Sequence, residues 1–195
     1  MAEPMLAYVS EHDYLDGERD AQQRHEYVDG RIFAMTGASR RHNIVTLNLG
    51  AGLHAHLRGR PCDVFVRDMR VHVRSVRAYY YPDVVVTCDG RDRKSDDVAG
   101  LEHPTLLIEV LSPSTEAIDR REKWLHYRQL ESLHEYVLVD PTQAWVEVFR
   151  RTDRGWVQEL HRDADAELAL QSVGLTLSLA TIYEGTAPAD DTPSA

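Results

Sequence analysis

The chain has 195 residues, of which 43% are hydrophobic and 28% are charged, so wholesale disorder is excluded and one compact domain is expected. No apolar run approaches the 18 residues that a membrane-spanning helix needs, and the N-terminus lacks a basic-then-apolar signal pattern, so we expect a cytoplasmic protein. The net charge of −10 argues against a nucleic-acid partner, because phosphate backbones bind positive surfaces.

The distribution of charge weakens that last exclusion. Residues 31–80 hold nine arginines and only two acidic residues, so the rest of the chain is strongly acidic. Such an asymmetry can place one basic face on an acidic protein. Lysine is rare in this arginine-rich chain, because Lys94 and Lys123 are the only two. The position of each lysine is therefore informative.

The first half of the chain predicts a short helix, a hairpin, a long helix and a strand. The helix lies at 10–15, and the hairpin spans 26–35 around Asp29-Gly30, a strong two-residue turn signal. Helical spacing over 41–57 predicts a helix with one apolar stripe and further leucines beside it. Cys62–Arg74 alternates and then shifts parity, which predicts a strand with a bulge or bend near Asp68. The predicted stripe is Ile44, Leu47, Ala51 and His54, with Leu49, Leu53 and Leu57 beside it.

The second half predicts buried strands around another helix. The valine run within 81–87 indicates burial on both faces, and 105–111 is a second apolar strand. A helix over 115–131 follows, with Ser114 as its N-cap. Further strands are expected at 135–139, 144–150 and 155–160, and residues 175–179 alternate once more. The order indicates an α/β fold (α+β with a mixed sheet) in one domain, 1–185, before a disordered tail at 186–195.

Two cysteines, Cys62 and Cys88, occur without CxxC spacing. They exclude a disulfide framework of several bridges and a zinc ribbon. We expect both to be buried free thiols.

Two acidic residues stand where folding alone would not place them. Asp83 heads the valine run, and Glu109 lies inside an otherwise apolar strand. A buried carboxylate without a partner is costly, so each needs a cation. The structural alternative pairs Glu109 with an arginine or puts it on a solvated edge. The functional alternative is a shared divalent cation, because carboxylates are ligands that magnesium and manganese prefer.

Asp119, Lys123 and Tyr127 are spaced i, i+4, i+8, so they form one line on the predicted helix. An ammonium is more compact than a guanidinium and suits a site beside a metal-bound water. The alternative is a solvated row of charges. His42 could contact a phosphate or the site, or equally cap the helix, and the turn 37–41 before that helix could meet a phosphate.

Several separated motifs together resemble the Uma2 family, a bacterial group of restriction-endonuclease-like proteins. They cover about residues 8 to 185. In chain order they are Glu26-Tyr27-Val28-Asp29-Gly30-Arg31-Ile32, Met35, His42, Pro82-Asp83, Glu109-Val110-Leu111-Ser112-Pro113-Ser114-Thr115, Asp119…Lys123…Tyr127 and Tyr136-Val137-Leu138-Val139-Asp140-Pro141.

The resemblance implies the PD-(D/E)XK nuclease fold, with an aspartate and a glutamate that bind magnesium (or manganese) and a lysine that assists the attacking water. Asp83 and Glu109 match the two acidic positions, with Val110 beside them at the metal. The lysine expected two residues after Glu109 is missing, because Leu111 stands there, and Lys123 is its replacement. Glu26 resembles an extra acidic residue that some members bring from an N-terminal element.

These inferences lead to one main hypothesis, a magnesium-dependent DNA endonuclease with Asp83, Glu109, Lys123 and Glu26 as catalytic residues. The residues expected to contact the substrate are His42, Arg40, Arg41, Arg67 and Tyr127. One rival is a binding module of the same fold without turnover, which the net charge and the displaced lysine favour. Another is a hydrolase of a small phosphorylated metabolite. A homodimer is expected, because two copies match duplex symmetry and the late strands leave an edge, with Trp145 and Trp156 as candidate interface anchors.

Overall fold

A six-stranded mixed sheet forms the centre of the computed structural model, which describes residues 8–35, 37–94, 99–163 and 165–187. The strand order is β10-β9-β8-β7-β6-β3, and only the β7–β8 pair is parallel. The mixed sheet confirms the predicted fold class. The six strands are β3 (Asp63–Val66), β6 (Val84–Thr87), β7 (Leu106–Val110), β8 (Glu135–Asp140), β9 (Trp145–Thr152) and β10 (Gly155–His161).

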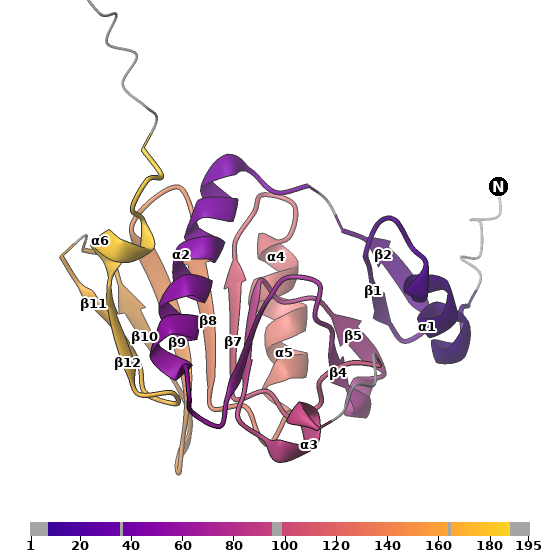
Figure 1. Cartoon of the computed structure of the whole chain (residues 1–195). Helices are drawn as coiled ribbons and strands as arrows, with labels where there is room; N and C mark the ends of the chain where they lie inside the picture. Colours follow the sequence, from indigo (N-terminus) through magenta and orange to yellow (C-terminus); the bar gives the residue numbers. More distant parts are fainter. Residues whose placement is uncertain (1–7, 36, 95–98, 164, 188–195) are drawn as a thin grey trace, which may run out of the picture.

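Helices cover both faces of this sheet (Figure 1). Helix α2 (Arg40–Leu57) packs on one face. The other face carries the connection between the parallel strands β7 and β8, made of α4 (Glu116–Ile118), a π-helical segment (Asp119–Lys123) and α5 (Trp124–Tyr127). Parallel neighbours need such a crossover.

The valine run of β6 is buried on both faces, as predicted. Val84 and Val86 pack in the core beneath α2, whereas Val85 packs in the core beneath α5. Alternate side chains of a strand point to opposite faces, so the run needs apolar residues at every position.

A second sheet, of order β2-β1-β5-β4, lies at one side of the molecule with α1 (Glu11–Arg19) against it (Figure 1). The predicted hairpin is confirmed, because Asp29 and Gly30 both have positive φ (43° and 90°), as a two-residue hairpin turn requires. Its strands are β1 (His25–Val28), β2 (Arg31–Ala34), β4 (Val71–Val73) and β5 (Ala78–Tyr80).

The C-terminal hairpin, β11 (Glu167–Leu170) and β12 (Leu175–Ser178), and α6 (Leu179–Ile182) pack beside α2 on the opposite side of the molecule (Figure 1). A 3₁₀ turn at Arg74–Val76 and the short α3 (Gly90–Arg93) complete the described elements. The tail predicted at 186–195 lies outside the described residues from position 188 onward.

Two predicted elements in the first half of the chain differ from the structure. The single strand expected at 62–74 is two strands in different sheets, because Arg67 and Asp68 both have positive φ and turn the chain. The long helix also buries a different stripe: Leu47 is 64% exposed, whereas Val45, Leu49, Leu53 and Leu57 lie in the core.

The prediction of free thiols is wrong, because Cys62 and Cys88 form a disulfide. The two residues lie immediately outside the paired Asp63 and Thr87, at the same end of the antiparallel β3–β6 pair. Their Cα atoms are 4.0 Å apart. Strand pairing therefore brings the sulfur atoms together across 26 residues of sequence.

The helix predicted over 115–131 is shorter and begins at Glu116, so Ser114 lies in the preceding turn rather than at the N-cap. Trp145 and Trp156 both contact side chains of their own chain. The Arg120 guanidinium carbon lies 4.5 Å from the Trp145 ring centroid, and the ring centroids of Trp156 and Trp124 are 4.9 Å apart. Within the described residues no helix is long and apolar enough to cross a membrane.

Candidate active site

Four carboxylates and one ammonium gather where β1, β6, β7 and the π-helical segment meet. We call Glu26, Asp83, Glu109, Asp119 and Lys123 the carboxylate cluster. Lys123 Nζ lies 2.8 Å from Glu26 Oε1, 3.1 Å from Glu109 Oε1 and 3.1 Å from Asp119 Oδ1. Only 4% of the Lys123 side chain is exposed, so the alternative of a solvated row of charges is wrong, and Lys123 points toward Glu109 as predicted.

Strand register explains why Asp83 and Glu109 share this location. Val84 pairs with Ile108, so the residues at the next position outward, Asp83 and Glu109, face one another across the same antiparallel pair. Residues opposite each other in such a pair point to the same face of the sheet. That face carries the crossover from β7 to β8, which supplies Lys123.

Asp83 is held by donors from three other parts of the chain. The backbone N–H of Val110 donates to Asp83 Oδ2 at 2.9 Å, and His42 Nε2 lies 3.2 Å from the same oxygen. The backbone N–H of Arg67 donates to the Asp83 carbonyl at 3.0 Å. These contacts fix one carboxylate oxygen and the backbone. His42, buried in the first turn of α2, is therefore a partner of Asp83 in addition to being a candidate for substrate contact.

Glu109 is held by the hydroxyl group of a buried tyrosine. The Tyr127 hydroxyl donates to Glu109 Oε1 at 3.2 Å, and the Tyr127 ring is fully buried. Tyr127 therefore supports Glu109 from behind and cannot reach a substrate directly. Glu26 also accepts from the backbone N–H of Tyr81 at 3.3 Å, which ties the hairpin to the strand that leads into Asp83.

Burial and neighbouring charges shift the pKa values of two members of the cluster, Glu109 and Lys123. Burial raises the pKa of Glu109 well above its ordinary value, and the carboxylates of Asp119, Asp83 and Glu26 add to that rise. Burial lowers the pKa of Lys123, but Glu109, Glu26 and Asp119 outweigh it and hold that pKa well above its ordinary value. Lys123 is therefore firmly charged, and a further cation would be attracted to the remaining carboxylate oxygens.

A cavity of about 200 Å³ opens onto the cluster. It lies between the N-terminal hairpin, the start of α2 and the start of α4. Glu26, Asp83, Glu109 and Lys123 form its polar part. Its other lining residues are Phe33, Ala34, Met35, Gly37, Ala38, His42, Arg67, Tyr81, Val110, Ser112, Ser114, Thr115 and Ile118.

The structure brings most of the predicted site residues to this cavity. Arg67 and Val110 line it. Arg40 and Arg41 do not; their guanidinium groups donate to the carbonyls of Gly185 and Thr142 at the exposed start of α2. Leu111, which occupies the usual lysine position, is buried in the core.

Sequence reasoning missed two apolar residues of the cavity wall, Phe33 and Ile118. Phe33 had a usable signal, because the Asp29-Gly30 turn fixes the register that pairs Glu26 with Phe33. No such sequence signal points to Ile118, because its position depends on where α4 begins. A wider depression of about 820 Å³ lies at the other end of β6, beside Cys88. There Glu102 pairs with His72 and Arg74, and Asp89 pairs with Arg91, so no comparable surplus of charge remains.

The donor set of the carboxylate cluster fits a hard divalent cation. All the oxygen atoms that the acidic side chains of the cluster offer belong to carboxylates. Asp119 Oδ1 is buried 3.1 Å from Lys123 Nζ but accepts no hydrogen bond. Among the described residues, no group of three or more His, Cys, Asp or Glu side chains is arranged to hold a metal ion. Magnesium is bound by only one or two carboxylates together with water and substrate oxygens, so the fit of this site depends on Asp83 and Glu109.

Comparisons with known proteins bear on the fold and on the family of this chain. A structure from Anabaena variabilis, described as "a putative nuclease belonging to DUF820", superposes with a TM-score of 0.77 over 92% of this chain and 99% of that one. At 19% identity it shows the fold, which is that of the described nuclease.

Two relatives come from Synechocystis, the uncharacterized proteins slr1290 and sll1609. The first is 37% identical over 92% of this chain and 93% of its own length. The second is 31% identical over 83% of this chain and 93% of its own length. Residues 11–181 match the model of the Uma2 family, which is described as "Putative restriction endonuclease". The chain therefore belongs to the Uma2 family.

Proposed function

We propose that this protein is a divalent-metal-dependent phosphodiesterase that cleaves DNA internally. The observation that carries the proposal is the carboxylate cluster, in which three carboxylates lie within 3.1 Å of one buried ammonium and Asp83 lines the same cavity. Such a surplus of negative charge is costly unless it serves to bind a cation. The family's description as a restriction endonuclease supports the same reaction class.

Asp83 and Glu109 would hold magnesium or manganese, with Val110 beside them. A bound divalent cation polarises a phosphoryl oxygen and lowers the pKa of a bound water. Val110 and His42 orient Asp83 so that Oδ2 is occupied and Oδ1 remains for a ligand. Tyr127 orients Glu109 in the same way.

Lys123 would act through its charge. The surrounding carboxylates raise the pKa of its ammonium well above the ordinary value, so Nζ keeps its proton near neutral pH. A charged ammonium donates hydrogen bonds to an attacking water or to the negative oxygens of the phosphorane, and it does not accept a proton. Glu26 holds Nζ from the hairpin side at 2.8 Å.

The arginines would bind flanking phosphates. Arg67 lines the cavity, and Arg40 and Arg41 lie outside it at the start of α2. Phosphate contacts of this kind set the register of DNA without reading its sequence. The rival of a module without turnover loses one argument, because Lys123 reaches the cluster despite its displaced position in the sequence.

Cleavage of supercoiled plasmid and of short oligonucleotides, with and without magnesium, tests the proposal. Wild type is expected to cleave only with the metal, and Asp83→Ala is expected to be inactive although it still folds. Absence of cleavage by wild type on all DNA substrates would favour the binding module. DNA binding that does not fall steeply with salt would favour a small phosphorylated substrate, because counterion release demands that fall.

The homodimer is part of this proposal. Strand β10 is an edge of the six-stranded sheet, and Val157 and Leu160 are exposed on it. An exposed apolar edge favours association with a second copy. Light scattering across micromolar concentrations is expected to return about twice 22.2 kDa, and a constant value of 22.2 kDa would contradict the dimer.

A further inference from the structure

The cavity has one feature that cation binding and phosphate contact leave unexplained, an exposed aromatic ring beside the carboxylates. Phe33 lies on β2 with 45% of its surface exposed. It lines the same cavity as Glu109 and Lys123. An aromatic side chain of this size is normally buried in a core, so its exposure beside a charged site indicates that it contacts a ligand.

The hairpin register fixes the direction of that ring. Phe33 is the cross-strand partner of Glu26, so both side chains leave the hairpin on the same face. Glu26 uses that face to reach Lys123 at 2.8 Å. Phe33 is therefore held at the edge of the carboxylate cluster by the same two-residue turn that places Glu26.

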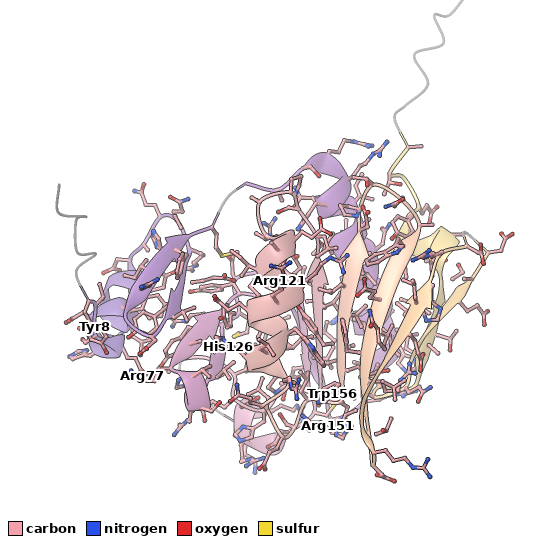
Figure 2. All side chains as sticks on the ribbon, turned by 180° about the vertical axis from the view of Figure 1, so that it is seen from behind. Tyr8, Arg77, Arg121, His126, Arg151 and Trp156 are labelled. Atoms are coloured by element: carbon pink, nitrogen blue, oxygen red, sulfur yellow. A yellow bond between two sulfur atoms is a disulfide. The ribbon has the colours of Figure 1, made fainter. Side chains whose placement is uncertain are left out.

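A second exposed apolar residue, from another element, lines the same cavity. Ile118 at the end of α4 is exposed and lines the cavity with Phe33. The cavity thus has carboxylates and an ammonium at its base and apolar groups from two elements on its walls. In Figure 2 the helical connection that carries Ile118 crosses the front of the sheet, and the N-terminal hairpin lies at its side.

A phosphodiester substrate offers two chemically different parts, a charged phosphate and a flat apolar base. The base of the adjacent nucleotide can meet Phe33 only when it is unstacked, because bases inside a duplex face their partners and neighbours. Base–aromatic stacking tolerates any sequence, since every base has a π-face. Enzymes that need a base outside the stack act most readily on unpaired strands.

We propose that Phe33 stacks on the base next to the scissile phosphate, with Ile118 on its other side, so that unpaired DNA is the preferred substrate. This inference rests on the proposed function and names the substrate form at the same site. Phe33 is then a specificity-determining residue, whereas the carboxylate cluster carries out the reaction on any DNA that reaches it.

The neighbouring residue of β2 provides a matched control. Ile32 is exposed to 42%, nearly as much as Phe33, but it pairs with Tyr27 and leaves the hairpin on the opposite face. Ile32→Ala therefore removes a similar exposed apolar group from the same strand without touching the cavity wall. Phe33→Trp keeps a stacking surface, and Phe33→Leu keeps apolar bulk without one.

The experiment measures binding by fluorescence anisotropy and magnesium-dependent cleavage for a labelled single-stranded oligonucleotide and the same sequence as a duplex. Wild type is expected to bind and cleave the single strand better. Phe33→Ala is expected to weaken single-strand binding about tenfold, the effect of one lost stacking contact, with little change for the duplex. Phe33→Leu should behave like alanine, and Phe33→Trp and Ile32→Ala should behave like wild type.

Other outcomes overturn the inference in distinguishable ways. If wild type cleaves the duplex at least as well, or if Phe33→Ala affects both forms equally, the stacking role is wrong and the nuclease proposal stands. If Ile32→Ala has the same effect as Phe33→Ala, the hairpin is acting through its stability. If wild type cleaves neither form with magnesium, the proposed function fails and this inference fails with it.

Discussion

Two buried ionic clusters in this molecule differ in one respect, the balance between charges and partners. The first surrounds Glu135, a fully buried residue of β8. Its carboxylate accepts from Arg150 Nε at 2.9 Å, from the backbone N–H groups of Gln171 and Ser172, and from the Ser172 hydroxyl. Arg150 in turn donates to Glu159 and to the Ala169 carbonyl. We call these residues the Glu135 cluster.

The Glu135 cluster leaves few lone pairs or protons without a partner, and it fastens β11 and the following turn to the main sheet. The carboxylate cluster has four acids for one lysine, and the pKa of Glu109 is raised by burial first and by the neighbouring carboxylates in addition. Both regions are buried and charged, so burial alone does not mark a functional site. The difference teaches that a surplus of one sign of charge indicates a functional site better than the burial of charged groups does.

The largest effect is expected when the Glu135 cluster loses its one arginine side chain, that of Arg150. Arg150→Met leaves Glu135 buried without a counter-charge, which should lower the free energy of unfolding by about 3–5 kcal/mol. Urea denaturation measures this, with the exposed Arg154→Met on the same hairpin as the control. Cleavage per folded molecule should stay near the wild-type rate. A selective loss of cleavage would contradict the structural role of the cluster.

The second prediction removes one negative charge from the carboxylate cluster, where Arg150→Met removes a positive one from the Glu135 cluster. Glu109→Gln should lower magnesium-dependent cleavage at least 100-fold, about 2.8 kcal/mol, because an amide is a poor cation ligand. Its free energy of unfolding should stay equal or rise, since one of several repelling buried charges is removed. Parallel cleavage assays and denaturation curves check both parts. A variant that is destabilised like Arg150→Met but active would reverse the assignment of the two clusters.

Lys123→Met removes the one ammonium that compensates Glu109. We expect a loss of about 2 kcal/mol near pH 8, less than for Arg150→Met because Glu109 can take up a proton. Loss of Lys123 raises the pKa of Glu109 further, so the folded variant binds a proton that the unfolded chain releases. That stabilisation is present at low pH and is lost as pH rises through the folded-state pKa.

The variant should therefore be closer to wild type at pH 5 than at pH 8. Denaturation of both proteins at the two pH values measures the difference. An equal loss of stability at both pH values would show that Glu109 does not take up a proton when Lys123 is lost.

The smallest effect concerns the residue that orients Asp83. His42→Ala should lower cleavage about tenfold, the usual cost of losing a group that positions a metal ligand. His42→Gln keeps a donor for Asp83 and should restore part of the activity. His54→Ala, an exposed histidine on the same helix, is the matched control. An unchanged rate for His42→Ala would leave Asp83 positioned by Val110 alone.

Much of the site follows from the sequence for a definable reason. Asp83 and Glu109 are charged residues within apolar runs, and such residues need a partner wherever the strands lie. Lys123 is conspicuous because the chain uses arginine almost everywhere else. Glu26 carried no comparable signal from its own surroundings, and only the family resemblance pointed to it.

The remaining features depend on tertiary context. An alternating run such as 62–74 has the same pattern whether it stays in one sheet or passes between two. Helix α2 carries two candidate apolar stripes, and only its packing selects Leu49 and Leu53 over Leu47. The Cys62–Cys88 disulfide requires knowledge that β3 pairs with β6.

The π-helical segment Asp119–Lys123 gives the crossover one wide turn between two α-helical pieces. Such turns behave as if one residue had been inserted into an ordinary helix. Deleting one residue there would rotate everything that follows by about 100° about the helix axis. Tyr127 would then leave Glu109, and Trp124 would leave its stack with Tyr136 and Phe149. In evolutionary terms, the number of residues in this turn is expected to be constrained more tightly than the identity of its exposed residues, Arg121 and Glu122.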